Sequence, residues 1–346
     1  MHLTFVDDSV VFDGYSPSSQ PLGGPEKAFA SLPPALARRG HEVIVFNRCG
    51  YKVIVDGSHW ETWDGDRPSA TDVLIAHRQP RLLESVPGAA QKVLWMTSPV
   101  APLDSGPNRA LLQRHRPTVV FVSEAQRGDW SNPDGLRVAV VPPGLSPSFL
   151  EDEPMTPAEP PRVLCTTHPL AGLEGLIGLW VNRIRPAVPA GELHIYSALL
   201  DRGQLGAEVE DDVRRVLDRA LAAKDEGVSI KRPGGDPDMA TAYREARLHL
   251  YPATVQWPYA WTLAESQACG LPAVARASAA AAERIGDGQT GIVAANDDAV
   301  VNAAINLLSD RFSFDRMSHT ARLVQRGRSW HVAAAEFEAT IQLVPA

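Results

Sequence analysis

The chain has 346 residues, of which 44% are hydrophobic and 21% charged, and its net charge is −8. This length predicts about two domains, and the apolar content excludes an intrinsically disordered chain. The acidic balance argues against a protein that binds the phosphate backbone of nucleic acids or an anionic membrane, because both partners require clustered lysine and arginine.

The cysteines and the first residues of the chain indicate a reducing compartment. Cys49, Cys165 and Cys269 are odd in number and far apart, so neither a disulfide framework nor a zinc site is expected. The N-terminus reaches Asp7 and Asp8 without a basic segment, unlike a signal peptide. No apolar run approaches the roughly 18 residues of a membrane span. We therefore expect a soluble, cytoplasmic protein.

The first half of the chain predicts a parallel sheet covered by helices. Short apolar runs alternate with amphipathic stretches, as is typical of parallel strands that are buried on both faces. Strands are expected at residues 3–6, 42–46, 72–76, 92–96 and 118–122, and a helix at 26–39. Gly40 follows two arginines and is a favourable place for that helix to end.

A proline-rich, acidic segment, residues 151–162, predicts a linker, after which the same alternation begins again. Strands are expected at 162–166, 193–196, 228–231, 248–251 and 273–275, and helices at 172–184, 238–246, 261–269, 297–308, 313–328 and 332–343. The two series predict an α/β protein with two doubly wound domains, residues 1–150 and 163–325. Ligands are expected in a cleft between them, where the carboxyl ends of the strands lie.

The first motif that could bind a ligand is the segment 20–26, which leads into the first long helix. Gly23 and Gly24 allow close approach of a ligand to the backbone, and Pro25 suits a first helical turn. The start of the helix attracts anions. An ordinary loop entering a helix is the alternative. The glycine fingerprint of dinucleotide-binding proteins and the P-loop are both absent from the sequence.

The second motif is the segment 251–274. A strand ends at Tyr251 and a helix begins near Trp261, so unpaired backbone N–H groups at the helix start are suited to phosphate. Glu265 lies one turn further on, where its carboxylate is placed to accept hydrogen bonds from a vicinal diol. The alternative for Glu265 is a solvated helix residue.

Several short motifs occur in a fixed order. They are Gly-Gly-Pro-Glu at 23–26, Arg-Gly-His-Glu-Val at 39–43, Val-Ser-Glu at 122–124, Val-Pro-Pro-Gly-Leu at 141–145, the segment 265–272 and the segment 283–293. Between about residues 3 and 340, this set resembles the retaining, nucleotide-sugar-dependent glycosyltransferases of family four. The resemblance implies the GT-B fold, with two Rossmann-like domains and a C-terminal helix, residues 326–346, that returns to the first domain.

The resemblance also implies roles for individual residues. Glu265 matches the second glutamate of the family's E-x7-E pattern, which holds the nucleotide ribose. The backbone of Tyr259, Ala260, Trp261 and Thr262 falls where amides meet the donor diphosphate, and Gly23 and Gly24 border the donor phosphate and the acceptor. No acidic pair of the metal-binding D-x-D type stands at a strand end, so we expect neither a metal nor any other cofactor.

The sequence departs from the family pattern at the residues that would contact the nucleotide-sugar donor. The first glutamate of E-x7-E is replaced by Trp257, which can stack on a sugar ring but cannot accept a hydrogen bond. Gln256 beside it is a candidate substitute. Thr166 and Ala171 occupy the positions of a basic pair that normally neutralises the leaving group. The candidate replacements are His168, Lys231, Arg232 and Arg276, although a solvated turn is the alternative for Lys231 and Arg232.

A further departure concerns a histidine that the family often carries after the strand at 92–96. Thr97 and Ser98 stand there instead. His77 and Arg78 follow the preceding strand and are the candidate catalytic side chains, together with Trp257. A structural role is the alternative for His77.

The resemblance implies transfer of a hexose-like sugar from a UDP-, GDP- or related nucleotide donor to a hydroxyl or amine of a small molecule or saccharide, with retention of anomeric configuration. The departures leave a second hypothesis open. The chain could be a degenerate transferase that keeps the fold in order to bind a nucleotide or to partner an active enzyme. No stretch of the sequence favours a third hypothesis, a nucleotide-sugar epimerase.

Overall fold

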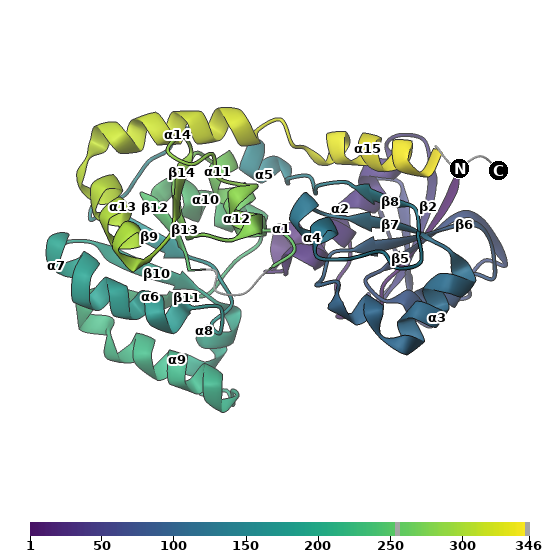
Figure 1. Ribbon diagram of the computed structural model, residues 1–346, viewed down its shortest axis with the longest axis horizontal. Coiled ribbons are helices and arrows are strands. Elements are labelled where there is room, and N and C mark those ends of the chain that lie inside the picture. Colours follow the sequence, from purple (N-terminus) through teal and green to yellow (C-terminus); the bar gives the residue numbers. More distant parts are fainter. Residues whose placement is uncertain (253–256, 343–346) are drawn as a thin grey trace. The chain divides into compact units, whose positions relative to one another are not determined.

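The computed structural model describes residues 1–252 and 257–342, and its chain divides into two units (Figure 1). The first unit consists of residues 1–146 together with the segment from Arg328 onwards, and the second consists of residues 147–327. Each unit has a sheet of its own. Among the described residues, no helix combines the length and the apolar character needed to cross a membrane.

The first unit contains an eight-stranded sheet in the order β3-β4-β2-β1-β5-β6-β7-β8. Its strands are β1 (His2–Val6), β2 (Glu42–Asn47), β3 (Val53–Val55), β4 (Ser58–Thr62), β5 (Ala70–His77), β6 (Gly88–Met96), β7 (Thr118–Phe121) and β8 (Val138–Val140). The pairing of β3 with β4 is antiparallel and the other pairings are parallel. The five expected strands are all present. The pattern of apolar runs did not reveal β3, β4 and β8 because these strands are short or polar, and β3 and β8 lie at the two edges of the sheet.

Helices cover this sheet and complete its core. They are α1 (Ser16–Ser19), α2 (Gly24–Ala37), α3 (Gly106–His115), α4 (Glu124–Gly128) and α15 (Trp330–Gln342), with 3-10 turns η1 (Pro80–Glu84) and η2 (Ala101–Asp104). Phe29 of α2 packs edge-on against Phe5 of β1, and Phe337 of α15 packs in the same way against Trp95 of β6. The last helix, yellow in Figure 1, therefore belongs to the first unit, as the resemblance implied.

The second unit contains a six-stranded parallel sheet in the order β11-β10-β9-β12-β13-β14. Its strands are β9 (Arg162–Cys165), β10 (Glu192–Tyr196), β11 (Val228–Lys231), β12 (Leu248–Tyr251), β13 (Ala273–Arg276) and β14 (Gly291–Ala294). The order reverses between β9 and β12, which is the arrangement of a doubly wound fold. The predicted fold class is confirmed, and β14 is an addition to it.

The helices of the second unit follow its strands along the chain. They are α5 (Pro147–Leu150), α6 (Leu173–Leu179), the π-helical turn η3 (Trp180–Ile184), α7 (Arg185–Ala187), α8 (Ala198–Gln204), α9 (Asp211–Ala222), the 3-10 turn η4 (Lys224–Glu226), α10 (Asp236–Glu245), α11 (Trp261–Ala268), α12 (Ala279–Ala282), α13 (Asp297–Ser309) and α14 (Arg311–Gln325). The described residues 151–161, within the expected linker, form neither helix nor strand.

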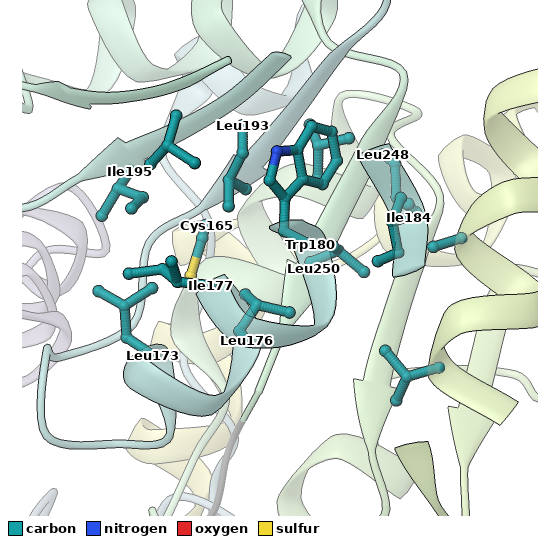
Figure 2. Close-up of a cluster of buried hydrophobic side chains, with 14 of the residues drawn as sticks. Cys165, Leu173, Leu176, Ile177, Trp180, Ile184, Leu193, Ile195, Leu248 and Leu250 are labelled. Carbon is teal, nitrogen blue, oxygen red and sulfur yellow. The ribbon is translucent and has the colours of Figure 1, made fainter. Parts of the chain in front are cut away.

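The core of the second unit is organised around Trp180 (Figure 2). This side chain is fully buried among aliphatic residues of the strands and of α6, such as Leu193, Leu250 and Ile177. Its indole N–H donates to the carbonyl of Glu226 at 2.9 Å, so the ring is buried without an unpaired donor. Burial of a large ring among aliphatic side chains stabilises the frame on which the carboxyl ends of β9 and β12 are held.

Candidate functional site

The end of β9, the strand β12 and the helix α11 are linked by polar side chains of the second unit, of which His249 and Ser266 are fully buried. Nε2 of His249 lies 3.0 Å from Oγ1 of Thr166, and Nδ1 of His249 lies 2.8 Å from Oγ of Ser266 on α11. Because Ser266 donates its own proton to the carbonyl of Leu263, Nδ1–H donates to Ser266 and Nε2 accepts from Thr166. Burial lowers the pKa of His249 to about 3, which keeps the ring neutral.

Glu265 is buried on α11 in the same unit. It is only 5% exposed, so the alternative that it is a solvated helix residue is wrong. The hydroxyl of Tyr243, a fully buried residue of α10, donates to Oε2 of Glu265 over 3.4 Å. Burial and the neighbouring Glu265 raise the pKa of Tyr243 well above its ordinary value, so this hydroxyl keeps its proton and remains a donor.

The residues before Glu265 form the start of α11. Ala260 precedes the helix, and its methyl side chain cannot cap the terminus. The first four backbone N–H groups of an α-helix have no intrahelical partner. Trp261 and Thr262 are the first two residues of α11, so their N–H groups are among these four. Tyr259 is buried with its ring 4.9 Å from that of Trp261. Trp257 is exposed. Gln256 lies outside the described residues.

The cations proposed from the sequence lie at separate places around the second sheet. His168 is exposed in the turn after β9, where its Nδ1 accepts from the N–H of Leu170. Lys231 is the last residue of the edge strand β11 and Arg232 follows it, two positions from β9 in the sheet order. Arg276 forms an ion pair with Asp297 at 3.1 Å. The structure therefore does not bring these four side chains together.

A cation that the sequence analysis missed packs against the segment that leads into α11. The guanidinium of Arg284 lies 4.6 Å from the ring centre of Tyr259, and its Nη1 donates to the Tyr259 hydroxyl at 2.9 Å. Its side chain is 14% exposed. The motif at 283–293 contained this arginine, but the sequence could not show that the motif folds back onto residue 259.

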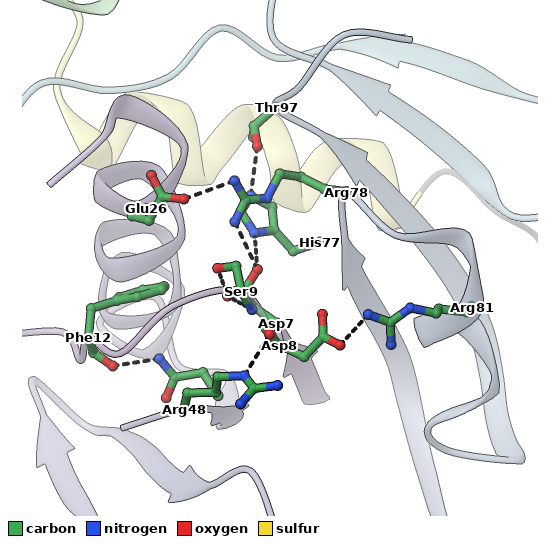
Figure 3. Close-up of polar contacts among 11 residues, drawn as sticks. Asp7, Asp8, Ser9, Phe12, Glu26, Arg48, His77, Arg78, Arg81 and Thr97 are labelled. Atoms are coloured by element: carbon green, nitrogen blue, oxygen red, sulfur yellow. Dashed lines mark hydrogen bonds and ion pairs between the residues drawn. The ribbon is translucent and has the colours of Figure 1, made fainter. Parts of the chain in front are cut away.

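A second polar network, in the first unit, joins the ends of β1, β5 and β6 (Figure 3). Nδ1 of His77 lies 2.8 Å from Oδ1 of Asp7, and Nε2 lies 2.7 Å from Oγ1 of Thr97. Burial lowers the pKa of His77, so the neutral ring donates from Nδ1 to Asp7 and accepts from Thr97. Burial alone would raise the pKa of Asp7, but hydrogen bonds from His77 and Ser9 and the charge of Arg78 hold it well below its usual range.

His77 was predicted as a catalytic side chain. Its ring has no exposed surface, and both of its nitrogens are engaged with Asp7 and Thr97. The imidazole therefore holds neighbouring groups in place, as the structural alternative expects, and the catalytic role of His77 stays a prediction. The missed partners Asp7 and Thr97 follow strands that the sequence analysis had identified, but their side-chain contacts could not be read from the sequence.

Arg78 occupies a strained backbone position directly after β5. Its φ is +62°, and this left-handed conformation costs about 1–2 kcal/mol for a residue with a Cβ. Its N–H donates to the carbonyl of Trp95, and its guanidinium donates to Glu26 at 2.9 Å and to Asp7 at 3.3 Å. Gly23 precedes α2, where a Cβ would overlap the carboxylate of Glu26.

Each unit contains a pocket among its described residues. A pocket of about 120 Å³ lies between the start of α6 and the ends of β12 and β13, lined by residues such as Gly172 and Tyr251. A pocket of about 620 Å³ lies at the amino ends of β1 and β2, away from the networks described above. Among the described residues, no group of three or more His, Cys, Asp or Glu side chains is placed to hold a metal ion.

The chain has two doubly wound units, and its last helix packs within the first unit. These features define the GT-B fold. Residues 199–310 match the family model described as glycosyl transferases group 1. The chain is similar in structure to sucrose-phosphate synthase from Thermosynechococcus elongatus, with a TM-score of 0.76, 13% identity and coverage of 99% of this chain and 98% of that one.

Two further solved structures give a similar result. HepE from Anabaena, in complex with UDP and glucose, has a TM-score of 0.70 and 15% identity, with coverage of 99% and 100% of the two chains. WaaG, a glycosyltransferase involved in lipopolysaccharide biosynthesis, has the same TM-score, identity and coverage. At these identities the likeness concerns the fold. A comparison with curated proteins found no significant match.

Proposed function

We propose that this chain is a glycosyltransferase that moves a sugar from a nucleotide-sugar donor to a hydroxyl or amine of an acceptor, with retention of anomeric configuration. The observation that carries the proposal is the burial of the Glu265 carboxylate of α11, which lies beside the Tyr243 hydroxyl of α10. A buried carboxylate at this place is suited to a neutral diol. The solved relative HepE in complex with UDP-glucose supports the class of donor.

In the proposed complex, Glu265 accepts hydrogen bonds from the two ribose hydroxyls. Hydrogen bonds to a charged group contribute about 1.5–3 kcal/mol each, more than neutral ones do. Tyr243 orients the carboxylate through the Oε2 that it contacts, and the N–H groups of Trp261 and Thr262 meet the diphosphate. Gly23 and Gly24 would border the donor phosphate and the acceptor.

The leaving diphosphate requires positive charge when the sugar bond breaks, because electrostatic stabilisation is usually the largest catalytic effect. Thr166 and Ala171 supply none at the positions where the family carries cations. We assign this task to Arg284, which lies against Tyr259, with His168, Lys231 and Arg232 as further candidates. The leaving phosphate then accepts the acceptor proton on the same face of the sugar. The proposal requires neither a metal nor a cofactor.

A second candidate function is a nucleotide-binding protein that has lost transferase activity. The observation that favours it is the neutral character of the end of β9, where Thr166 is hydrogen-bonded to the neutral His249. The exposed Trp257 in place of a glutamate adds to it. Glu265 remains buried under either function, so nucleotide binding is common to both.

Thermal unfolding with UDP, GDP, ADP and TDP, each free and as sugar conjugates, tests both functions. A ligand at 100 times its dissociation constant stabilises the folded chain by about 2.7 kcal/mol. We expect one base to stabilise the chain and its sugar conjugate to release free nucleotide slowly. Stabilisation without release from any donor would favour the second function.

A pair of variants tests the ribose assignment itself. Glu265→Ala should abolish the stabilisation by nucleotide, whereas Glu174→Ala should preserve it, because Glu174 is an exposed residue of α6. If the nucleotide effect survives intact in Glu265→Ala, Glu265 does not hold the ribose.

A further inference from the structure

The second unit begins with a segment that lies against its own helices α10 and α11. We call residues 147–153 the strap. It starts with the short helix α5 and continues into the acidic run Glu151, Asp152 and Glu153, whose side chains are exposed. Phe149 of the same segment is buried, with only 1% of its surface exposed. The strap therefore contributes one ring to the interior of the second unit and three carboxylates to its surface.

A buried cation holds the strap in place. Arg244 of α10 is only 5% exposed, and a buried guanidinium requires polar partners because its removal from water is costly. Its Nη2 donates to the carbonyl of Ser148 at 2.8 Å, and its Nη1 lies 3.0 Å from the carboxylate of Glu153. The strap supplies both of these partners, so the charge of Arg244 favours the strap in its present position.

The helix α14 and the residue that follows it restrain the strap as well. The guanidinium groups of Arg322 and Arg326 both donate to Oδ1 of Asp152 at 2.7 Å. Arg326 also donates to the carbonyl of Glu151 at 2.7 Å. Because Asp152 is exposed, these pairs contribute less than the buried contacts of Arg244. Arginines from two parts of the second unit thus hold the segment that carries Phe149.

The buried ring of Phe149 packs against the tyrosine that contacts Glu265. The ring centres of Phe149 and Tyr243 lie 6.0 Å apart with their planes inclined at 49°, a separation at which aromatic rings attract one another. The hydroxyl of Tyr243 reaches Oε2 of Glu265 over 3.4 Å, close to the longest distance at which a hydrogen bond forms. A small shift of the Tyr243 ring away from Glu265 would therefore break this bond.

From this series of contacts we propose that Phe149 is a positioning residue for the nucleotide site: through Tyr243, the strap sets the orientation of the Glu265 carboxylate. Because Arg244 holds the strap by its charge, a change that releases the strap weakens nucleotide binding. The inference rests on the proposed function and adds a means of regulating that same site. Its signature is a loss of affinity for the ribose hydroxyls, since Tyr243 contacts the group that would hold them.

The surroundings of Tyr243 can be followed without a nucleotide. With 3-fluorotyrosine incorporated into the whole chain, fluorine NMR assigns the Tyr243 signal as the one that Tyr243→Phe removes. We expect Phe149→Leu to shift or broaden this signal, because the ring beside Tyr243 is lost. Phe314→Leu is the matched control. Phe314 is also buried in the second unit, but its ring packs against Arg247, so the Tyr243 signal should stay in place.

A second variant tests the fastening of the strap without changing the interior. Glu153→Gln removes the charge that faces Arg244, so the Tyr243 signal should change here too. Glu153 is exposed, so this variant should fold even where Phe149→Leu does not. The matched control is Glu174→Gln, which removes the charge of an exposed glutamate on α6 and should leave the signal in place.

Nucleotide affinity gives an independent readout. For the nucleotide that stabilises the parent, Phe149→Leu should weaken binding about two- to fivefold, at most the effect of losing the Tyr243 hydrogen bond. The loss should be smaller for the 2′,3′-dideoxy analogue. In a Tyr243→Phe background, Phe149→Leu should cause no further change in the difference between the two nucleotides, because the hydroxyl through which it acts is gone.

Three results would overturn the positioning role of Phe149. They are an unchanged Tyr243 signal in Phe149→Leu, an equal change of that signal in Phe314→Leu, and equal losses of affinity for the two nucleotides. An unchanged signal in Glu153→Gln would overturn the role of the strap's charges. If no nucleotide stabilises the parent, the proposed function fails, and the fluorine signal still decides whether the strap holds Tyr243.

Discussion

Each unit holds a buried imidazole that contacts a threonine hydroxyl at a strand end, but the two surroundings differ in charge. His77 of the first unit lies between Thr97 and the carboxylate of Asp7, with Arg78 and Glu26 beyond it. His249 of the second unit lies between the hydroxyls of Thr166 and Ser266. Burial lowers the pKa of both rings.

The difference shows two ways of burying polar groups near the end of a strand. The first network contains charges that compensate one another, so removing one member leaves another unpaired in a buried place. The second network is neutral and tolerates the loss of a hydroxyl at smaller cost. A network of the second kind also brings no positive charge to the strand ends, so the proposed transferase must take its cation from elsewhere in the chain.

The largest effect is expected from Asp7→Asn. The amide keeps the shape of the side chain but removes the charge that faces Arg78 and His77, and breaking a buried ion pair costs about 3–5 kcal/mol. Urea unfolding should show this loss. Asp8→Asn is the control, because its partner Arg81 is more than half exposed and such pairs contribute about 0–1 kcal/mol. Equal losses in the two variants would mean that the first network is not charge-compensated.

An acid-sensitive step is expected in the second unit. The pKa of His249 falls from 6.5 in the unfolded chain to about 3 in the fold. The unfolded chain therefore binds the additional proton first, and the stability that is complete above pH 6.5 is lost as the pH falls toward 3. Lowering the pH to 5 should cost about 2 kcal/mol through this residue.

Unfolding of His249→Gln at pH 7.5 and pH 5 measures this contribution. The variant should lose about 2 kcal/mol less than the parent between the two pH values. His331→Gln, at an exposed position of α15, should behave as the parent does. An unchanged loss in His249→Gln would show that the ring is not held neutral.

The smallest effect is expected from Tyr243→Phe, which removes one hydroxyl beside Glu265. A single buried hydrogen bond contributes about 1 kcal/mol, so nucleotide affinity should fall about fivefold. The loss should be smaller for a 2′,3′-dideoxy nucleotide, because only the ribose hydroxyls depend on the orientation of Glu265. Tyr196→Phe, on β10, is the control. Equal losses for both nucleotides would give Tyr243 a purely structural role.

The sequence was sufficient for elements that are apolar throughout. The strand at 118–122 is apolar after Thr118 and the strand at 273–275 is apolar at every position, and they lie in the two sheets as β7 and β13. The three helices after residue 296 were also expected, because their apolar positions follow the helical period. Burial of apolar side chains determines the structure of these elements, and the residue types in the sequence predict which positions are buried.

The networks were beyond the sequence because they depend on which strand ends become neighbours. His77 and Thr97 were both noted, but their contact depends on β5 lying beside β6. Tyr243 occupies a buried position of α10, and periodicity alone could not pair it with Glu265 on α11. The strands β3 and β4 carry polar residues such as His59, so the alternation of apolar runs did not reveal them.

The placement of α15 has a consequence for the order in which the protein matures. Phe337 contributes to the packing around Trp95, yet it is made after every residue of the second unit. On the ribosome the second unit is therefore complete in sequence while the first still lacks its final helix. Since domains fold as units during synthesis, the half that begins first is the half that finishes last. A stop codon just after residue 327 would damage the N-terminal half of the protein and spare the half next to the break.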